Sequence, residues 1–435
     1  MITIGLDIGT TTISAVAAQS QCGVVDAITV SNGTFIPGPH SWEKIQQPEL
    51  IWEKVIDCLR QLLERHPDCE GIGVTGQQHG ILYLDAAGAC VSPLYTWQDG
   101  RSALPESGGL TYAETLAALS GYAVPVGYGM ATHDYNLKNG LVPQNASVFC
   151  TIQDFVAMRL SGRTAPLIDA SDAASFGLFD LKSSSFDASA AARAGISADI
   201  FPAVSRPAVL GAGHTGLPVC TAIGDNQASF IGATQGAKDC MLINIGTGSQ
   251  ISIHSSEMHS CPGLEQRPFP QGGSLTVGAS ICGGRAYAML ERFFSRTLEM
   301  VTGKSVSCYD AMAALASEEV PEDPPVFVTT FQGTRADPEK RGSISGLTEQ
   351  NFTPRDFIYG MLNGTVQELY EMYCRYTASG APTPKALYGS GNGLRKNALL
   401  RKLLEDRFEI PLQLSANEEE AAYGAALYAA QILEM

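Results

Sequence analysis

One short pattern occurs twice in this sequence. The segment IGLDIGTTTIS at residues 4–14 returns near mid-chain as LINIGTGSQIS at residues 242–252. Each copy is an apolar run, a turn of Gly and hydroxyl residues, and a second run rich in β-branched residues, which predicts a hairpin with a tight turn. One such hairpin in each half predicts two similar domains, and 435 residues exceed what one core usually holds.

The two turns are suited to bind an anion. Glycine lets a ligand approach the backbone closely, and Thr hydroxyls with turn N–H groups form a concavity for oxyanions. The chain has 28 basic and 44 acidic residues, so its field disfavours nucleic acid and anionic membranes as partners. A bound polyphosphate must then be neutralised locally, by turn amides and a divalent cation. We therefore expect a nucleotide with Mg²⁺.

One difference between the two copies bears on which ligand each turn would bind. The first carries Asp7 at the end of its strand, where the second carries Asn244. A carboxylate beside a phosphate turn is suited to hold Mg²⁺ through water, although an Asx-turn that caps the hairpin is the alternative. Asn244 would bind phosphate without competing for the ion. The pair therefore predicts a metal side and a phosphate side.

Strands and helices alternate along the first half. Apolar spacing predicts a helix over 51–65 and a buried strand over 71–76, and this order indicates an α/β architecture with a mixed sheet. The segment 183–218 is rich in Ser, Ala, Gly and Pro and is predicted to run over the surface. We place the domain junction near residue 236, which divides the chain into 1–235 and 236–435.

The second half ends in two predicted helices. One spans 394–407 and follows a strand and the turn Gly389-x-Gly391-x-Gly393, whose spacing does not fit a dinucleotide fold. Close approach to a flat ring such as adenine is the better use of these glycines, and a plain strand-to-helix turn is the alternative. The other helix spans 421–430, with Asn417 and Glu420 as a capping box and an Ala/Gly-rich face for close packing.

Several polar residues follow apolar strands and are candidates for a site. Asp225 comes directly after the strand-like 221–223 and Gly224, where a general base would be expected, although a helix N-cap is the alternative. His79, Trp97, Asp99 and Arg101 are side chains of the kind that bind hydroxyl-rich ligands. A structural His79 and a simple Asp99/Arg101 ion pair are their alternatives.

The cysteines and the hydropathy pattern argue against disulfide-rich, zinc-binding and membrane-spanning proteins. The eleven Cys residues are scattered without a Cys-x-x-Cys pair, which disfavours a disulfide framework or a zinc site. No basic leader segment and no apolar run of about 20 residues is present. We therefore expect a cytoplasmic protein.

Taken in order, these motifs resemble the FGGY carbohydrate kinases, within the sugar kinase, Hsp70 and actin superfamily. The resemblance runs the full length, through DIGTT at 7–11, TGQQHG at 75–80, GD at 224–225, GTGS at 246–249 and GSGNG at 389–393. It implies an α/β fold of two actin-like (ribonuclease H-like) domains around a central cleft, each with a mixed five-stranded sheet flanked by helices. Residues 1–235 would bind the sugar and the first phosphate, and 236–435 the nucleotide.

The resemblance also implies roles for individual residues. MgATP would donate its γ-phosphate to a terminal hydroxyl of a ketose, with Asp225 as the catalytic base and Asp7 as the Mg²⁺ residue. The expected partners are the small-molecule sugar and ATP. The sequence does not determine the oligomeric state, and a homodimer is compatible with it. The cofactor residues would be Thr10, Thr11, Thr12, Gly246, Thr247 and Gly248 at the phosphates and Gly391 and Asn392 near adenine. The sugar contacts would be Gln78, His79, Trp97, Asp99, Asp225 and Asn226.

Local strings bear on which sugar is bound. Those at 96–101, 152–155, 172–175, 224–229 and 341–347 are most similar to family members that act on sedoheptulose. Gln78 stands where xylulose kinases usually have Met, and Tyr135 replaces a common Trp without a Lys three residues before it. The alternatives are xylulose or another ketose or polyol, and a catalytically silent sugar- or nucleotide-binding module. The presence of both Asp7 and Asp225 argues against a silent module.

Overall fold

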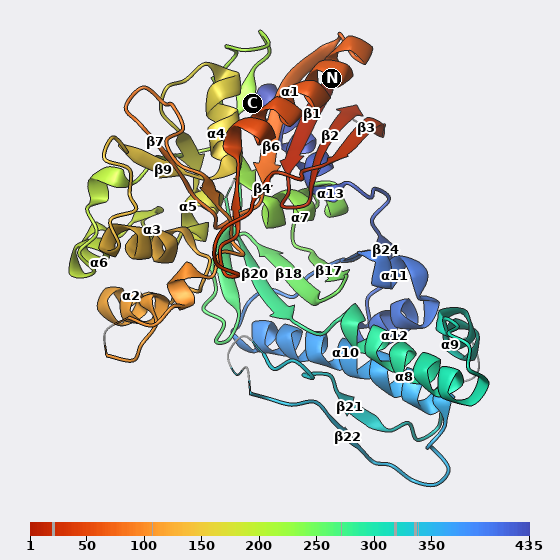
Figure 1. The fold of residues 1–435 in the computed structure, drawn as a ribbon. Coiled ribbons are helices and arrows are strands. Elements are labelled where there is room, and N and C mark those ends of the chain that lie inside the picture. Colours follow the sequence, from red (N-terminus) through yellow and green to blue (C-terminus); the bar gives the residue numbers. More distant parts are fainter. Residues whose placement is uncertain (20–21, 107, 271, 317–319, 335–336, 338) are drawn as a thin grey trace. The chain divides into compact units, whose positions relative to one another are not determined.

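The computed structural model describes residues 1–19, 22–106, 108–270, 272–316, 320–334, 337 and 339–435. It divides into two compact units (Figure 1). Unit 1 comprises Met1–Gly236, Arg267–Gly272 and Asn417–Met435, and unit 2 comprises Ala237–Gln266 and Gly273–Ala416. The expected division into 1–235 and 236–435 therefore differs from the structure in two segments, because 267–272 and 417–435 pack with the first unit.

Among the described residues, the sheet of unit 1 is mixed and contains seven strands. Its first three strands form an antiparallel meander in chain order, and the first strand also pairs in parallel with a later strand, which follows helix α1 (Pro48–Arg65). These four strands are β1 (Ile2–Ile8), β2 (Thr12–Gln19), β3 (Gly23–Ser31) and β6 (Cys69–Gly76). On the other side of β6 lie β15 (Val219–Cys220) and β16 (Ile223–Gly224), both parallel to it, and β14 (Val209–Gly211) pairs with β15.

The described part of unit 2 repeats this arrangement in a six-stranded sheet. A three-stranded antiparallel part continues into two parallel strands, in the same order as in unit 1. The strands are β17 (Met241–Ile245), β18 (Ser249–Ser255), β20 (Ser274–Ser280), β23 (Leu387–Ser390) and β24 (Leu412–Leu414), with β19 (Glu265–Pro268) next to β20. The two hairpins predicted from the sequence are confirmed, and the five expected strand positions are extended by short edge strands.

Helices and smaller sheets complete unit 1. The predicted helix over 51–65 is α1, whose apolar stripe of Ile51, Val55, Leu59 and Leu62 is buried against the sheet. The other helices are α2 (Tyr112–Ser120), α3 (Gly129–Lys138), α4 (Ile152–Ser161), α5 (Ala170–Ser175), α6 (Ala188–Arg193), α7 (Asp225–Thr234) and α13 (Glu420–Glu434), and α1 itself is Pro48–Arg65. The small sheets are formed by β4 (Phe35–Ile36), β5 (Ile45–Gln46) and β8 (Leu94–Tyr95), by β7 (Leu82–Leu84) and β9 (Val148–Cys150), by β10 (Leu167–Asp169) and β13 (Ala203–Ser205), and by β11 (Phe179–Asp180) and β12 (Ser185–Phe186).

The segment 183–218 departs from its prediction as a surface run. Ala190, Ala191 and Ile196 are fully or almost fully buried in a second core of unit 1. Short Ala side chains on the six-residue helix α6 can pack in a core without producing the apolar periodicity that marks a longer buried helix. The prediction of a surface segment was therefore wrong for this part.

Unit 2 carries five helices among its described residues: α8 (Gly284–Thr302), α9 (Tyr309–Ala316), α10 (Pro354–Ala378), α11 (Asn392–Lys396) and α12 (Ala398–Phe408), with the strand pair β21 (Val326–Val328) and β22 (Ser343–Ser345). The predicted single helix over 394–407 is two helices. Asn397 is extended, and its side chain accepts the Leu400 N–H as the N-cap of α12. In the part of the chain described, no helix combines the length and the apolarity needed to cross a membrane.

The C-terminal helix α13 packs on α7 and on the sheet of unit 1. The predicted capping box is wrong, since the N-cap is Glu419 and its side chain makes no capping hydrogen bond. The predicted close packing is confirmed: a Cβ added to Gly424 would lie 1.8 Å from the Ala228 carbonyl oxygen, and one added to Gly5 would lie 1.8 Å from that of Ala422. Glycine is required at both contacts because backbone meets backbone.

Candidate active site

Three parallel strands of unit 1 end side by side. Asp7 of β1 lies opposite Thr75 of β6, and Gly224 of β16 lies opposite Gly76. The residues that follow these strands therefore meet at one edge of the sheet. This register brings together three of the predicted site residues, Asp7, Gln78 and Asp225.

Asp225 is the first residue of α7. Burial raises the pKa of its carboxyl, while Arg267 and the backbone N–H groups of Asn226 and Gln78 lower that pKa. A carboxylate that accepts two backbone N–H bonds is held in one orientation. The carboxylate is therefore fixed in direction, and the residue as a whole is only partly buried.

Asp7 is partly buried and lies among other acids. Burial, Asp225 and Glu419 together raise the pKa of Asp7 to about 7. Glu419, the residue before α13, accepts a hydrogen bond of 2.9 Å from the Thr29 hydroxyl. No local pattern in the sequence indicates that Glu419 would lie near a residue 412 positions earlier. Mutual repulsion of these carboxylates favours a bound cation.

The first glycine–threonine turn is braced by a polar ring. The Thr10 hydroxyl donates to Gln77 Oε1 at 3.0 Å and accepts from Trp97 Nε1 at 2.9 Å. Gln77 donates to Gln46 Oε1 at 2.8 Å, and Gln46 donates to the Thr10 carbonyl at 3.0 Å. Thr10 and Trp97, predicted for different ligands, are thus neighbours. The Thr11 and Thr12 side chains remain exposed.

Amide side chains lie beside Asp225. Gln78 is buried, and its Nε2 donates to the Ser171 carbonyl at 3.1 Å and contacts Gln227 Oε1 at 3.5 Å. Asn226 Oδ1 is buried and has no hydrogen-bond partner in the described part of the chain. An acceptor left in this state is suited to a ligand hydroxyl.

His79 has a backbone conformation that is uncommon for a residue with a side chain, with φ of 73°. Its Nδ1 lies 2.8 Å from the Ser175 carbonyl oxygen, and its ring stacks on Tyr128 at 4.2 Å between centroids. Non-glycine residues held in the left-handed region cluster at functional sites. Sequence reasoning did not identify Tyr128, because nothing local marks an aromatic 49 residues away as a stacking partner.

Asp99 does not occupy the place predicted for a sugar contact. It is fully buried, and its oxygens accept from Arg101 Nε at 2.7 Å, Arg101 Nη2 at 3.1 Å and the Lys44 N–H at 3.0 Å. The Arg101 guanidinium also lies over the Tyr95 ring at 4.1 Å from its centroid. The structure therefore supports the alternative of an internal ion pair, and Asp99 is removed from the candidate sugar contacts.

A buried acidic network lies behind the site. Gln153 Nε2 donates to Asp172 Oδ1 at 2.8 Å, and Thr151 Oγ1 donates to Asp154 Oδ2 at 2.7 Å. Burial raises the pKa of Asp154 and that of Asp172, and repulsion from Asp154, Asp169 and Asp225 also raises the pKa of Asp172. The strings at 152–155 and 172–175 were noticed in the sequence, but neither acid was given a role there.

In unit 2 the second glycine–threonine turn joins β17 to β18. The start of α8 packs on it: Gly284 N–H donates to the Gly246 carbonyl at 2.9 Å, and Arg285 N–H donates to the Thr247 carbonyl at 3.0 Å. A Cβ on Gly248 would lie 2.7 Å from the Ser280 carbonyl oxygen. The turn therefore presents Thr247 on a backbone that is closely packed from behind.

The Gly389–Gly393 loop lies next to this turn, because β17 and β23 are parallel neighbours. Gly391 has φ of +87°, and Asn392 begins α11. Asn244 was expected to bind phosphate; instead its Nδ2 donates to the Ser390 hydroxyl at 2.6 Å. The amide thus links the two turns of unit 2.

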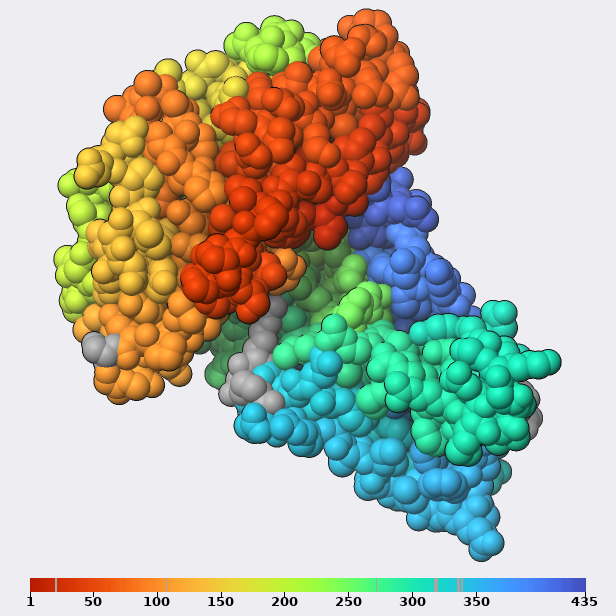
Figure 2. Space-filling view, viewed as in Figure 1, coloured from red at the N-terminus to blue at the C-terminus, as the bar shows by residue number. Residues whose placement is uncertain are grey.

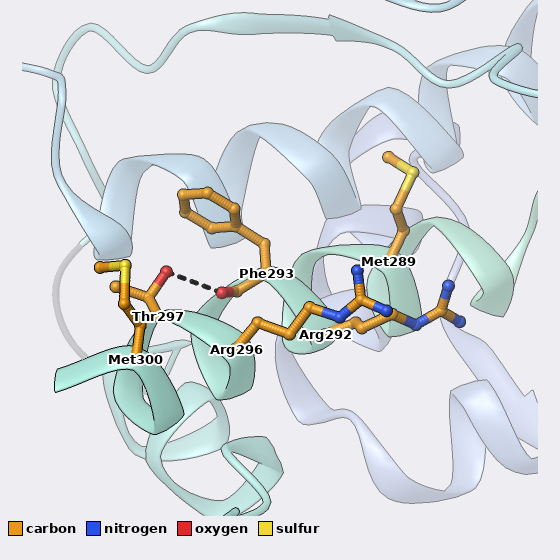
Figure 3. Close-up of a pocket in the computed structure, with 6 residues that line it drawn as sticks. All are labelled: Met289, Arg292, Phe293, Arg296, Thr297 and Met300. Atoms are coloured by element: carbon orange, nitrogen blue, oxygen red, sulfur yellow. Dashed lines mark hydrogen bonds between the residues drawn. The ribbon is translucent and has the colours of Figure 1, made fainter. Parts of the chain in front are cut away.

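Helix α8 of unit 2 carries a surface hollow that is not lined by any of the predicted site residues. Its lining residues are Met289, Arg292, Phe293, Arg296, Thr297 and Met300 (Figure 3). The chain around residue 300, teal in Figure 2, is at the surface, with Met300 79% exposed.

A duplicated actin-like fold, with carboxylates at strand ends in one unit and paired glycine turns in the other, is that of the sugar kinases. The chain belongs to the FGGY family of carbohydrate kinases: residues 2–232 match the family's N-terminal domain and 241–432 its C-terminal domain.

Individual relatives agree with this assignment. The chain is 27% identical to mouse sedoheptulokinase and 26% identical to the human one, over 98% of this chain and 96% of each relative. The crystal structure of xylulose kinase from Rhodospirillum rubrum superposes with a TM-score of 0.82 at 25% identity, covering 100% of this chain and 89% of that one.

Proposed function

We propose that this protein transfers the γ-phosphate of ATP to a terminal hydroxyl of a ketose, with sedoheptulose as substrate and its 7-phosphate as product. The observation that carries the proposal is the convergence of Asp225 and Asp7 at the ends of two strands that both pair with β6, together with the buried acceptor of Asn226. A fixed carboxylate next to an acceptor for hydroxyls is what a sugar kinase requires of its acceptor side.

Asp225 is the proposed general base. The substrate hydroxyl loses its proton to this carboxylate as its oxygen forms a bond to the γ-phosphorus; the bond from that phosphorus to the bridging oxygen breaks, and ADP leaves with the electron pair. Burial moves the pKa of Asp225 upward, toward the range of an effective base. The two backbone N–H donors keep the carboxylate aimed at the reacting oxygen.

Asp7 is the proposed Mg²⁺ residue, with Asp225 and Glu419 contributing negative charge. Bound Mg²⁺ would offset the charge of the phosphates during transfer. Within the described ranges, no three His, Cys, Asp or Glu side chains are grouped to hold an ion directly. Asp7 would therefore hold the ion through water and through the nucleotide phosphates.

The glycine turns of unit 2 are the proposed nucleotide site. Gly246, Thr247 and Gly248 would bind phosphate through turn N–H groups, and Gly391 and Asn392 would lie beside adenine. Thr10, Thr11 and Thr12 of unit 1 would bind the transferred phosphate. The proximity of the two turns of unit 2, linked through Asn244 and Ser390, is compatible with one nucleotide spanning both.

Gln78, His79, Trp97 and Asn226 are the proposed sugar contacts. The choice of sedoheptulose rests on the local strings and on the two sedoheptulokinases among the relatives. The ring of Trp97, 46% exposed and held by its bond to Thr10, offers a face for the C–H side of a sugar.

A sugar panel tests this proposal. ADP release coupled to NADH oxidation is followed with sedoheptulose, xylulose, ribulose, gluconate and glycerol, for the wild type, Asp225→Asn and the exposed control Asp57→Asn. We expect the highest kcat/KM with sedoheptulose, a loss of at least about 100-fold in Asp225→Asn, and no change in Asp57→Asn. Highest kcat/KM with another sugar would correct the substrate, and ADP release that no sugar stimulates would favour the silent binding module.

A further inference from the structure

The segment 267–269, which lies between β18 and β20 in the sequence, packs on helix α7. Gln227 Nε2 donates to the Pro268 carbonyl at 2.9 Å. The Phe269 ring, 9% exposed, meets the Phe230 ring edge-on at 5.7 Å between centroids. Because α7 begins at Asp225, these two contacts hold the segment that carries Arg267 against this helix, and the charge of Arg267 lowers the pKa of the Asp225 carboxyl.

The surroundings of Arg267 are strongly acidic. Asp225 interacts electrostatically with Asp7 and Asp172 as well as with Arg267, and Glu419 acts on Asp7. Arg267 therefore brings a positive charge to a region of four carboxylates, in a protein of net charge −16. The electrostatic interaction of Arg267 with the proposed catalytic base suggests a second function for this charge, in the reaction itself.

We propose that Arg267 binds the phosphoryl group on the acceptor side, both during its transfer and as the phosphate ester of the product sugar. This inference rests on the proposed function. In the proposed reaction the attacking oxygen would lie within hydrogen-bond distance of Asp225 and the phosphorus about 3 Å further on. The transferred group would then come within about 6 Å of the carboxylate with which Arg267 interacts.

The chemistry of arginine suits this role. A guanidinium presents paired donors that match two phosphate oxygens, whereas an ammonium acts as a point charge. No bond to Arg267 forms or breaks; it stabilises charge on the transferred oxygens and can return to Asp225 when the product leaves. Turnover and product binding should therefore both depend on this side chain.

The test compares Arg267→Gln and Arg267→Lys with Arg206→Gln, a matched control at an exposed arginine of unit 1. In Arg267→Gln we expect kcat to fall about 100-fold, with KM for ATP and for the sugar changed by less than about 3-fold. Arg267→Lys should recover part of the loss. By calorimetry, affinity for sedoheptulose 7-phosphate should fall about 10-fold in Arg267→Gln, and affinity for sedoheptulose should not change.

The outcomes separate this inference from the proposed function. Arg267→Gln with kcat and phosphosugar affinity within twofold of Arg206→Gln overturns the role of Arg267 in an active kinase. A wild type that phosphorylates no sugar overturns the proposed function, and the phosphosugar comparison then still decides for or against Arg267. A wild type that neither turns over nor binds phosphosugar overturns both.

Discussion

The contact between α13 and α7 makes a sharp prediction for Gly424→Ala. An added Cβ would lie 1.8 Å from the Ala228 carbonyl oxygen and 2.8 Å from the Gly232 nitrogen. An ordinary contact of carbon with a carbonyl oxygen needs more than 3 Å, so the helices must separate by about 1.5 Å. Both sides of the contact are backbone, and no rotamer change relieves it.

Two effects oppose each other in this variant. Replacing Gly by Ala inside a helix stabilises by about 1 kcal/mol through propensity. Overpacking typically costs about 1–3 kcal/mol, and a clash between two backbones lies at the upper end of that range. The steric effect wins, and we expect a net loss of about 2 kcal/mol, or about 4–8 °C in the midpoint of a unit of this size.

The assay can isolate unit 1, because all three tryptophans, Trp42, Trp52 and Trp97, lie there. Thermal unfolding followed by Trp fluorescence is compared for the wild type, Gly424→Ala and Ala421→Gly in the same helix. If propensity alone governed, Gly424→Ala would raise the midpoint and Ala421→Gly would lower it by a similar amount. A midpoint for Gly424→Ala at or above that of the wild type would refute the steric argument.

Further predictions concern the acids and the metal. Burial raises the pKa of Asp154 to about 7, so between about pH 4 and 7 the folded state binds more protons than the unfolded chain and its stability falls as pH rises. The thermal midpoint followed by Trp fluorescence should therefore drop from about pH 5 to about pH 8, and it should drop by less in Asp154→Asn. An equal drop in both proteins would contradict the raised pKa of Asp154. Chelation of Mg²⁺ by EDTA should abolish sugar-stimulated ADP release. In a metal titration at saturating ATP, Asp7→Asn should raise the half-saturating Mg²⁺ concentration about 10-fold. An unchanged Mg²⁺ requirement in this variant would remove Asp7 from the proposed metal site. The Trp97→Phe variant keeps an aromatic face but loses the bond to Thr10, so we expect KM for the sugar to rise by less than about 10-fold, and a larger loss in kcat would place Trp97 at the chemical step.

Part of the site could be predicted from the sequence because its signals are local. Asp7 and Asp225 each follow an apolar strand directly, and parallel strands end at the same edge of a sheet, so local order was sufficient to bring them together. The glycine turns of unit 2 were recognisable for the same reason. Asp99 shows the limit: its residue type suits a sugar, but burial against Arg101 makes it an internal partner.

Other features depend on contacts between residues that are far apart in the chain. Glu419 reaches the surroundings of Asp7, and Arg267 reaches Asp225, through segments assigned from the sequence to the other domain. The capping box predicted at Asn417 and the continuous helix predicted over 394–407 failed because tertiary packing sets helix boundaries as strongly as local preference does.

By itself the sequence determined the duplication, the α/β class and the chemistry of the turns, since strand periodicity and turn composition are properties of a few consecutive residues. Only the tertiary structure decided that the last helix completes the first unit, which carboxylates share a neighbourhood, and which polar side chains are consumed in internal bonds. The physical reason is that burial and charge proximity arise from packing, and close packing here depends on glycine contacts between helices and strands hundreds of residues apart.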